Sequence, residues 1–352
     1  MSINLAEKYE TKLDERFVAG SFTDKWTGNN YNWDGVNTIK IWTLLTDDLN
    51  NYTASGANRF GTPTEVDDEI NTYSLSRKRS FAKTFDETNV QDTMFIRKAN
   101  TYLKQMWDER YVPEIDKYRL ATWANGAGNV TVNSTALTKG TIIAALRVGI
   151  ETLDNASVPS EGRVIFMPPA MVTAYMLSTE MQYQQAFVAD GVIKGQVGNF
   201  GGCPVVQVPD ARLPKGLNFM IKYRQASVDP MKLRMLRVNT DAPGICGSLM
   251  EGLCRYDSFV LANKADGIYC HFKSDACAAP TFSRSTSTLT ITSADTGTIK
   301  YTTDGSNPKT SVNAATYSSG ITVAVGDKVR AYVEKSGYTN SGIAAYDVDS
   351  IT

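Results

Sequence analysis

The sequence predicts an α+β fold over roughly residues 1–275, followed by a separate all-β domain over residues 279–352. Two observations predict the α+β part. Apolar residues recur at helical spacing between residues 90 and 123, and alternating or continuous apolar runs typical of strands stand on both sides of this stretch. A third observation predicts the β domain: beyond residues 274–280 the composition turns to Ser, Thr and Gly, with short β runs and no helical period.

The composition is that of an ordinary globular protein. The chain has 352 residues, enough for two or three domains, with 42% hydrophobic and 21% charged residues. Its net charge of -1 argues against a dedicated nucleic-acid binder, although one face can still be locally basic. The first residues, MSINLAEK, are polar, and no apolar run approaches the roughly 18–20 residues of a membrane span. We therefore expect neither a signal peptide nor a membrane partner.

Cysteine and histidine usage predicts no cofactor, no metal and no catalytic residue. The five cysteines are odd in number and contain no CxxC pair, so we expect neither a disulfide framework nor a zinc ribbon. The one histidine, His271, lies in the apolar run IYCHF and is interpreted as a strand residue. A catalytic triad or a multi-histidine metal site is hard to build with one histidine.

The N-terminal 35 residues are polar, with a short charged helix expected over residues 6–17. Four aromatic residues follow without a period, which suits a segment that packs on another surface: Phe22, Trp26, Tyr31 and Trp33. The alternative is an unstructured tail.

Residues 36–85 predict a long two-stranded hairpin with a broad tip. Residues 36–45 alternate like a strand, residues 50–63 are rich in turn residues, and residues 70–85 return as the second strand. Because an isolated two-stranded ribbon is marginal in water, we expect this hairpin to lie on another surface.

Two helices should follow the hairpin. Residues 86–89 supply N-cap side chains, and the apolar residues of 90–108 have helical spacing. Pro113 should end this helix and begin the next, which carries Glu114 and Asp116 in its first turn.

The middle of the chain predicts a mixture of helices and strands. A loop over residues 125–138 precedes these expected elements: a helix over 139–155 capped by Thr138, a strand over 164–167, a helix over 170–178, and strands over 216–223, 231–238 and 252–272. The glycine-rich stretch 191–202 lacks a following GK[ST], so we do not interpret it as a phosphate loop.

The strings RKRSFAKTFDETN and RYVPEIDKYRLA, separated by the long helix, resemble the major capsid proteins of tailed bacteriophages, which have the Hong Kong 97 (HK-97-like) fold. The match lies in the order and spacing of these strings. The resemblance implies an N-terminal arm over residues 1–35, an E-loop hairpin over 36–87, the spine helix and start of the peripheral domain over 88–135, a mainly axial domain over 136–225, and late peripheral-domain strands over 226–275.

The C-terminal part predicts a small β-sandwich. Strands are expected over residues 289–293, 298–303, 320–325, 328–334 and 343–348. The strings IKYTTDGSNPKT, TYSSGITV and VRAYVEKSGYTNS resemble the C-terminal immunoglobulin-like or fibronectin-like domain of chitobiase and β-hexosaminidase, an accessory domain rather than the hydrolytic one.

The capsid resemblance implies a structural protein. It would assemble with itself as hexamers and pentamers into an icosahedral shell around double-stranded DNA, without sequence specificity. The virion would be assembled in the bacterial host cytoplasm. Other implied partners are a portal and scaffold or decoration proteins. The residues expected at contacts between subunits are Tyr52, Arg59, Phe60, Arg77, Lys78, Arg79, Glu114 and Asp116.

Alternatives remain open at these positions. The charged residues of the hairpin fit a solvated rim equally well, and Glu114 and Asp116 fit simple helix capping. The hairpin tip, residues 50–61, contains no lysine, so we expect none of the Lys–Asn cross-links that some members of the resembled family form.

Two other functions are compatible with parts of the sequence. The first is a surface module that binds host-surface or mucosal glycans by stacking sugars on tyrosines of the C-terminal domain. Its candidate tyrosines are Tyr301, Tyr317, Tyr332, Tyr338 and Tyr346. For most of them, packing inside the domain is the simpler interpretation, and Tyr338 is the candidate glycan contact. A glycan-active enzyme would need two positioned carboxylates, and no motif singles out such a pair.

Overall fold

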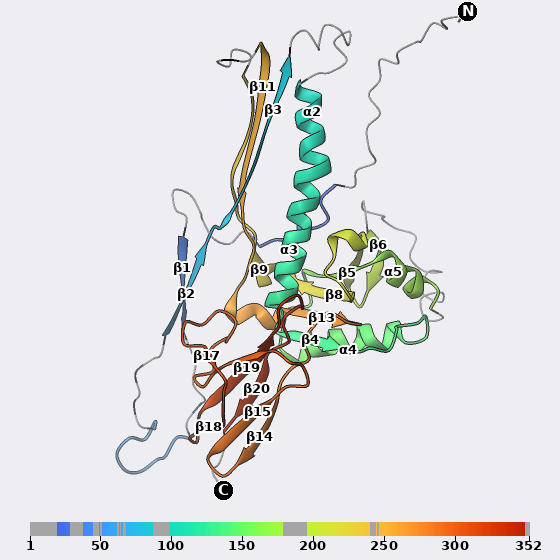
Figure 1. The fold of residues 1–352 in the computed structure, drawn as a ribbon. Helices are drawn as coiled ribbons and strands as arrows, with labels where there is room; N and C mark the ends of the chain where they lie inside the picture. Colours follow the sequence, from blue (N-terminus) through green and yellow to red (C-terminus); the bar gives the residue numbers. More distant parts are fainter. Residues whose placement is uncertain are drawn as a thin grey trace, which may run out of the picture.

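The computed structural model describes residues 20–28, 38–44, 49, 51–61, 63, 65, 68–86, 99–178, 196–239, 244 and 246–348. A long helical column and a long β-ribbon run side by side away from a mixed α/β body, and a small β domain lies at the opposite end of that body (Figure 1). The predicted residues 6–17, 31 and 33 fall outside the described part of the chain.

The predicted hairpin is present but shorter than expected. Strand β1 (Thr38–Leu44) pairs antiparallel with β2 (Asp68–Ser74). The chain then turns, and β3 (Arg77–Asp86) pairs with a strand from late in the sequence instead. The prediction of one continuous strand over residues 70–85 is therefore wrong. The turn is held by Asp257, whose Oδ2 accepts hydrogen bonds from the Ser76 amide (2.7 Å) and hydroxyl (2.9 Å).

The long ribbon consists of β10 (Met231–Asn239), β11 (Gly247–Tyr256) and β3 in that order. The predicted strand over residues 252–272 is wrong, because the chain bends after Tyr256 at the buried Asp257–Ser258 corner. Short elements follow this bend: β12 (Phe259–Val260), which pairs with β9 (Ser227–Val228), the 3-10 turn η5 (Ala262–Gly267) and β13 (Ile268–Phe272).

The helical column is continuous through the proline that was expected to break it. Helix α2 (Ala99–Met106) passes through a π-helical turn, η2 (Trp107–Tyr111), directly into α3 (Val112–Gly126). The Val112 amide donates to the carbonyl of Trp107, five residues back. This wider turn relieves the clash between the Pro113 ring and the preceding carbonyls, so the column loses only the hydrogen bond that the proline nitrogen cannot donate. The expected start of the helix, at residues 86–90, lies mostly outside the described residues; Asp86 itself ends β3.

The body is built on one mixed six-stranded sheet. Three strands of this sheet lie in the segments predicted as strands over residues 164–167, 216–223 and 252–272. Strand β13 is parallel to β4, and β5 is parallel to β7, whereas the other neighbours are antiparallel. The order is β4 (Asn129–Val132), β13, β8 (Leu217–Tyr223), β5 (Arg163–Met167), β7 (Cys203–Gln207) and β6 (Gln196–Phe200).

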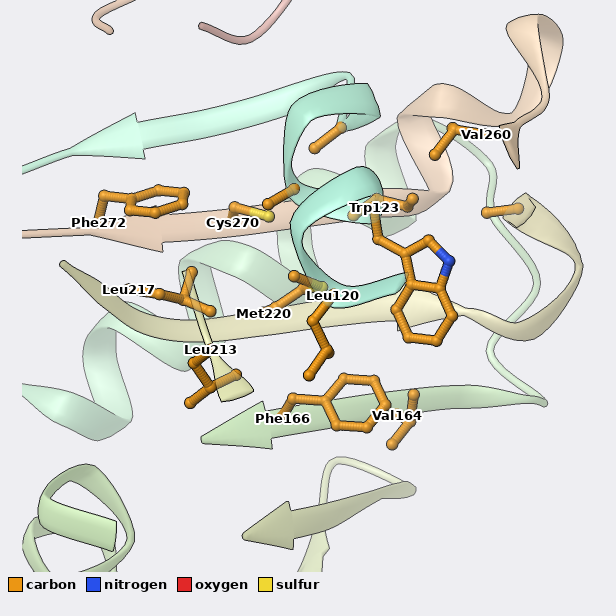
Figure 2. Packing of buried hydrophobic residues seen from close by; sticks show 14 of the residues in the cluster. Leu120, Trp123, Val164, Phe166, Leu213, Leu217, Met220, Val260, Cys270 and Phe272 are labelled. Carbon is orange, nitrogen blue, oxygen red and sulfur yellow. The ribbon is translucent and has the colours of Figure 1, made fainter. Parts of the chain in front are cut away.

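Helices cover both faces of this sheet, which is why β5 is buried along its whole length. Helix α3 packs Leu120 and Trp123 on the face that carries Val164 and Phe166 (Figure 2). Helices α4 (Ile142–Asn155) and α5 (Pro169–Met176) cover the opposite face. Helix α4 was predicted three residues longer, with Thr138 as its cap. Gly149 lets α4 approach closely, since a Cβ there would lie 2.8 Å from Ile221.

Four short elements link these parts: the 3-10 turns η1 (Asp24–Trp26), η3 (Asp210–Arg212) and η4 (Arg224–Ala226), and strand β9. Segment 20–28, which contains η1, lies against the base of α3, and Gly28 bridges to Val228.

The C-terminal domain has two sheets that share one small core. The five predicted strands are present, three of them shortened, and β14 and β17 were not predicted. One sheet is β14 (Thr281–Ser285), β15 (Thr288–Thr292) and β18 (Ile321–Thr322); the other is β17 (Ala315–Thr316), β16 (Thr298–Thr302), β19 (Lys328–Glu334) and β20 (Ala344–Asp347). Leu289 from the first sheet and Val329 from the second meet in the shared core.

Candidate interaction surfaces

The tip of the hairpin, residues 51–61, is a closed loop with exposed apolar side chains. The Thr53 amide donates to the Arg59 carbonyl at 3.0 Å, and Gly56 and Gly61 adopt positive φ angles of 93° and 96°. The rings of Tyr52 and Phe60 lie 5.1 Å apart. Yet these side chains are 59% and 82% exposed, so they cover each other without being covered by the rest of the described chain.

The exposed tip continues with Leu49, which is fully exposed. Burying a large apolar side chain is worth about 1.5–3 kcal/mol, and none of these three residues obtains that within the described chain. The sequence-predicted contacts Tyr52, Arg59 and Phe60 are thus brought together. A bare apolar tip on an extended loop indicates a surface that another molecule covers.

The basic residues of β3 meet the helical column of their own chain. Arg79 Nε lies 2.6 Å from Glu114 Oε1, and the Arg77 guanidinium lies 4.2 Å from the centre of the Tyr118 ring. The first pair is half-exposed, so it contributes only ~0–1 kcal/mol. Lys78 is exposed opposite Arg255. Arg79 and Glu114 are therefore close within one chain, and their role between subunits stays a prediction.

Asp116 has a different place: it is fully buried and holds segment 20–28 against α3. Its Oδ1 accepts hydrogen bonds from the hydroxyls of Ser21 (2.8 Å) and Thr23 (2.7 Å), and its Oδ2 accepts one from the Phe22 amide (3.1 Å). Oδ2 also lies 2.8 Å from Nη1 of Arg212. Both oxygens are satisfied inside the chain, so we leave Asp116 out of the proposed subunit contacts.

Two more buried cations hold the same segment. Arg119 Nη1 contacts Asp24 Oδ1 at 2.5 Å, and Lys222 Nζ donates to the Trp26 carbonyl at 2.7 Å while lying 4.1 Å from the centre of the Trp123 ring. Burial lowers the pKa of Lys222 to about 7.

Phe22 and Trp26, which were expected to pack on another surface, pack on the core beneath α3 of their own chain. Sequence reasoning missed Arg212 and Lys222 as the partners of this segment. The signal was present for Lys222, which stands inside the apolar run LNFMIKY: a charge in a buried strand needs a partner.

The tyrosines of the C-terminal domain do not form one platform. Tyr332 is 4% exposed, Tyr346 packs on Phe282 in the core, and Tyr301 and Tyr317 pack edge to face. Tyr338 is 40% exposed, with Lys335 Nζ 4.2 Å from its ring centre. Tyr338 therefore remains the accessible candidate for a glycan contact.

Four of the five cysteines and the one histidine are buried, and Cys246 is exposed. Among the described residues, no three His, Cys, Asp or Glu side chains are grouped so that they could hold a metal ion. No disulfide links the cysteines, and burial raises the pKa of Cys270 to about 12. His271 is buried, stacked on Phe219, with Nδ1 3.1 Å from Asn218 Nδ2, and burial lowers its pKa. Within the described chain no helix is both long and apolar enough to cross a bilayer.

One comparison with known protein families matches the C-terminal part of the chain. A family described as "Fn3 associated" matches residues 289–348. The narrower likeness to chitobiase and β-hexosaminidase stays a prediction. No curated protein matches the chain in sequence.

Among solved structures, similar folds come from bacteriophages. A structure titled "Mycobacterium phage Che8" matches with a TM-score of 0.65 and 15% identity, covering 78% of this chain and 98% of that one. The PhiM1 mature capsid matches with a TM-score of 0.61 and 12% identity, covering 76% and 91%. The capsid of cyanophage P-SCSP1u matches with a TM-score of 0.60 and 16% identity, covering 76% and 93%. At these identities the likeness shows a shared fold: the chain has the fold of these phage structures, two of which are titled as capsids.

Proposed function

We propose that this chain is the major capsid protein of a tailed bacteriophage, a non-enzymatic subunit that assembles as hexamers and pentamers into an icosahedral shell around double-stranded DNA. The observation that carries the proposal is the shared fold, which spans 91% and 93% of the chains in the two structures titled as capsids. The HK-97-like assignment of the arm, E-loop, peripheral and axial domains is part of the same proposal.

The hairpin tip supports assembly on physical grounds. A loop that leaves Leu49, Tyr52 and Phe60 exposed gains apolar burial only when another chain covers it. In a closed shell every subunit supplies the same tip and the same receiving surface, so one such contact is repeated throughout the lattice.

The proposed subunit contacts are therefore the tip residues Tyr52, Arg59 and Phe60. The exposed Lys78 of β3 is a further proposed contact. Arg77, Arg79 and Glu114 are at least partly exposed and link β3 to α3 within one chain, and they can take part by exchanging intrachain for interchain partners. Portal, scaffold and decoration proteins, and the packaged DNA, belong to this proposal as partners. The virion would be the final location.

The C-terminal domain is proposed to lie on the outer surface of the shell as decoration or adhesion. Its match to a family of fibronectin-associated domains supports an accessory role. The exposed Tyr338 favours a second function for this domain, binding of host-surface glycans through ring stacking.

Electron microscopy of the overexpressed chain, beside a variant lacking residues 50–61, tests the proposal. We expect shells, tubes or capsomer rings from the full chain and none from the deletion. A full chain that stays monomeric at high concentration would contradict the capsid function. Assembly of the deletion variant as readily as the full chain would contradict the role of the tip alone.

A further inference from the structure

The helical column ends where α3 passes into β4, and the C-terminal domain supplies the hydrogen bonds at this end. The last carbonyls of a helix have no partner inside the helix and must find donors elsewhere. Lys309 Nζ donates to the carbonyls of Asn125 (2.9 Å) and Ala127 (2.7 Å). The Ile343 amide donates to the Gly128 carbonyl at 2.7 Å. Residues of the C-terminal domain therefore do for α3 what C-cap residues of the same segment do for other helices.

Lys309 suits this position by its charge and its reach. Its Nζ lies at the C-terminal end of α3, where the helix dipole favours a cation. Both hydrogen bonds of the ammonium go to main-chain carbonyls, and the centre of the Tyr332 ring lies 5.5 Å away. Because an ammonium that leaves water needs such acceptors, the loop that carries Lys309 docks favourably only at this end of the helix.

The chain at Gly342 lies directly against the start of β4. A Cβ at this position would lie 2.8 Å from the Val130 amide nitrogen and 2.9 Å from the Gly128 carbonyl oxygen, so only glycine fits here without a shift of the main chain. The side chain of Ile343, the next residue, packs against the hydrophobic core beneath α3. Both the main chain and a side chain of this segment thus contact the body.

Two asparagines of the C-terminal domain widen the contact. The Asn340 amide donates to Asn125 Oδ1 at 3.2 Å, and Asn307 Nδ2 donates to the carbonyl of Ala262, at the start of η5, at 3.1 Å. The domain therefore contacts α3, β4 and η5 at once. We propose that the C-terminal domain is an internal brace, which caps α3 and fixes the helical column to the six-stranded sheet. This function goes beyond display on the surface of a shell.

Hydrogen–deuterium exchange of the unassembled full chain tests the brace, because amide exchange reports local opening. Gly342→Val should undock the domain, since the added side chain would meet the main chain of β4. We expect exchange at least about tenfold faster in residues 338–346, and also in residues 124–132, which lose their donors from the C-terminal domain. Exchange in residues 163–176, which contain β5 and α5, should not change.

Ala324→Val is the matched control, because it places the same side chain at an exposed position of the same domain; its exchange should match the wild type. Lys309→Met, which removes two hydrogen bonds without adding bulk, is the second variant if Gly342→Val does not fold, and it should also speed exchange in residues 124–132. Unchanged exchange in residues 124–132 of either variant overturns the proposal, whether or not residues 338–346 open. All these contacts lie within one chain, so the outcome does not depend on whether shells form.

Discussion

Segment 20–28 is held by charges that lie inside the protein. Asp116 is fully buried with Arg212, and Lys222 is fully buried beneath Trp26 and Trp123. A buried charge is tolerated only when it is paired and hydrogen-bonded, and removing one partner leaves the other uncompensated. These residues therefore fix segment 20–28 in one position on the body. Substituting them should lower the free energy of unfolding more than substituting the surface ion pairs.

Asp116→Ala should lower the free energy of unfolding by about 3–5 kcal/mol, because the Arg212 guanidinium would stay buried without its carboxylate. Asp347→Ala is the matched control: Asp347 also pairs with an arginine, Arg330, at 2.6 Å, but is 52% exposed, so its removal should cost ~0–1 kcal/mol. Urea unfolding of the unassembled chain, followed by tryptophan fluorescence, measures both. Equal losses from the two variants would contradict the anchoring role of Asp116.

Lys222 should make stability depend on pH. Burial lowers its folded pKa to about 7 from an ordinary value of 10.5, despite the favourable charge of Asp229. Between these two pH values the unfolded chain binds more protons than the folded one, so this lysine makes stability rise with pH through the window. Below pH 7 both states are protonated and the full penalty for burying the charge applies.

The stability of the wild type relative to Lys222→Met should therefore increase across this window, by up to about 1.4 kcal/mol per pH unit. Urea unfolding of both proteins at a series of pH values above 7 measures the difference. A difference that stays constant, or that falls as pH rises, would show that Lys222 is not a buried, weakened base.

Individual elements follow local sequence patterns closely, and the exceptions have local causes. The column between residues 99 and 126 is helical as its apolar spacing predicts. Pro113 does not break it, because the π-helical turn at Trp107–Tyr111 takes up the misfit. In that turn the rings of Trp107 and Tyr111 stack with their centres 5.4 Å apart. This stacking stabilises the π-helical turn relative to a regular α-helical one.

The hairpin tip is the element whose change should affect assembly without affecting the fold. Tyr52→Ser combined with Phe60→Ser should raise the protein concentration needed for assembly by at least about tenfold, because each apolar side chain loses about 1.5–3 kcal/mol of burial in the proposed contact. Light scattering against concentration measures this. The melting temperature of the unassembled chain should not change, since both side chains are exposed there.

Val312→Ser is the control for that experiment, because Val312 is 83% exposed but lies on the C-terminal domain. Its assembly should match the wild type. If the Val312 variant were impaired as strongly as the tip variant, general surface hydrophobicity rather than the tip would explain the loss.

On the scale of the whole molecule, the C-terminal domain is docked on the body. The Ile343 amide donates to the Gly128 carbonyl at 2.7 Å, and Lys309 binds carbonyls at the C-terminal end of α3, where the helix dipole favours a cation. Burial nevertheless lowers the pKa of Lys309 to about 7. These contacts give the C-terminal domain a defined orientation relative to the helical column (Figure 1).

A chain that ends after Ala278 should still fold, because the six-stranded sheet is complete at Phe272. It should form shells in electron micrographs. A chain that ends after Gly267 is the comparison: it lacks β13, which joins β4 to β8, and it should be insoluble. Failure of the first truncation to assemble would give the C-terminal domain a role in the shell itself.

The sequence by itself determined the types of most elements, the separate β domain and the resemblance to phage capsid proteins, since these depend on local period, turn residues and ordered motifs. Only the tertiary structure decided which distant strands pair, as β3 does with β11, and which polar residues become buried. Asp116 looks like a helix-capping residue in sequence and is a buried anchor in the fold. Asn71 looks like an ordinary strand residue and is 2% exposed, with no hydrogen-bond partner for its carboxamide among the described residues. Burial is a property of packing between remote parts of the chain, and a local pattern indicates it only where a continuous apolar run surrounds the residue, as LNFMIKY surrounds Lys222.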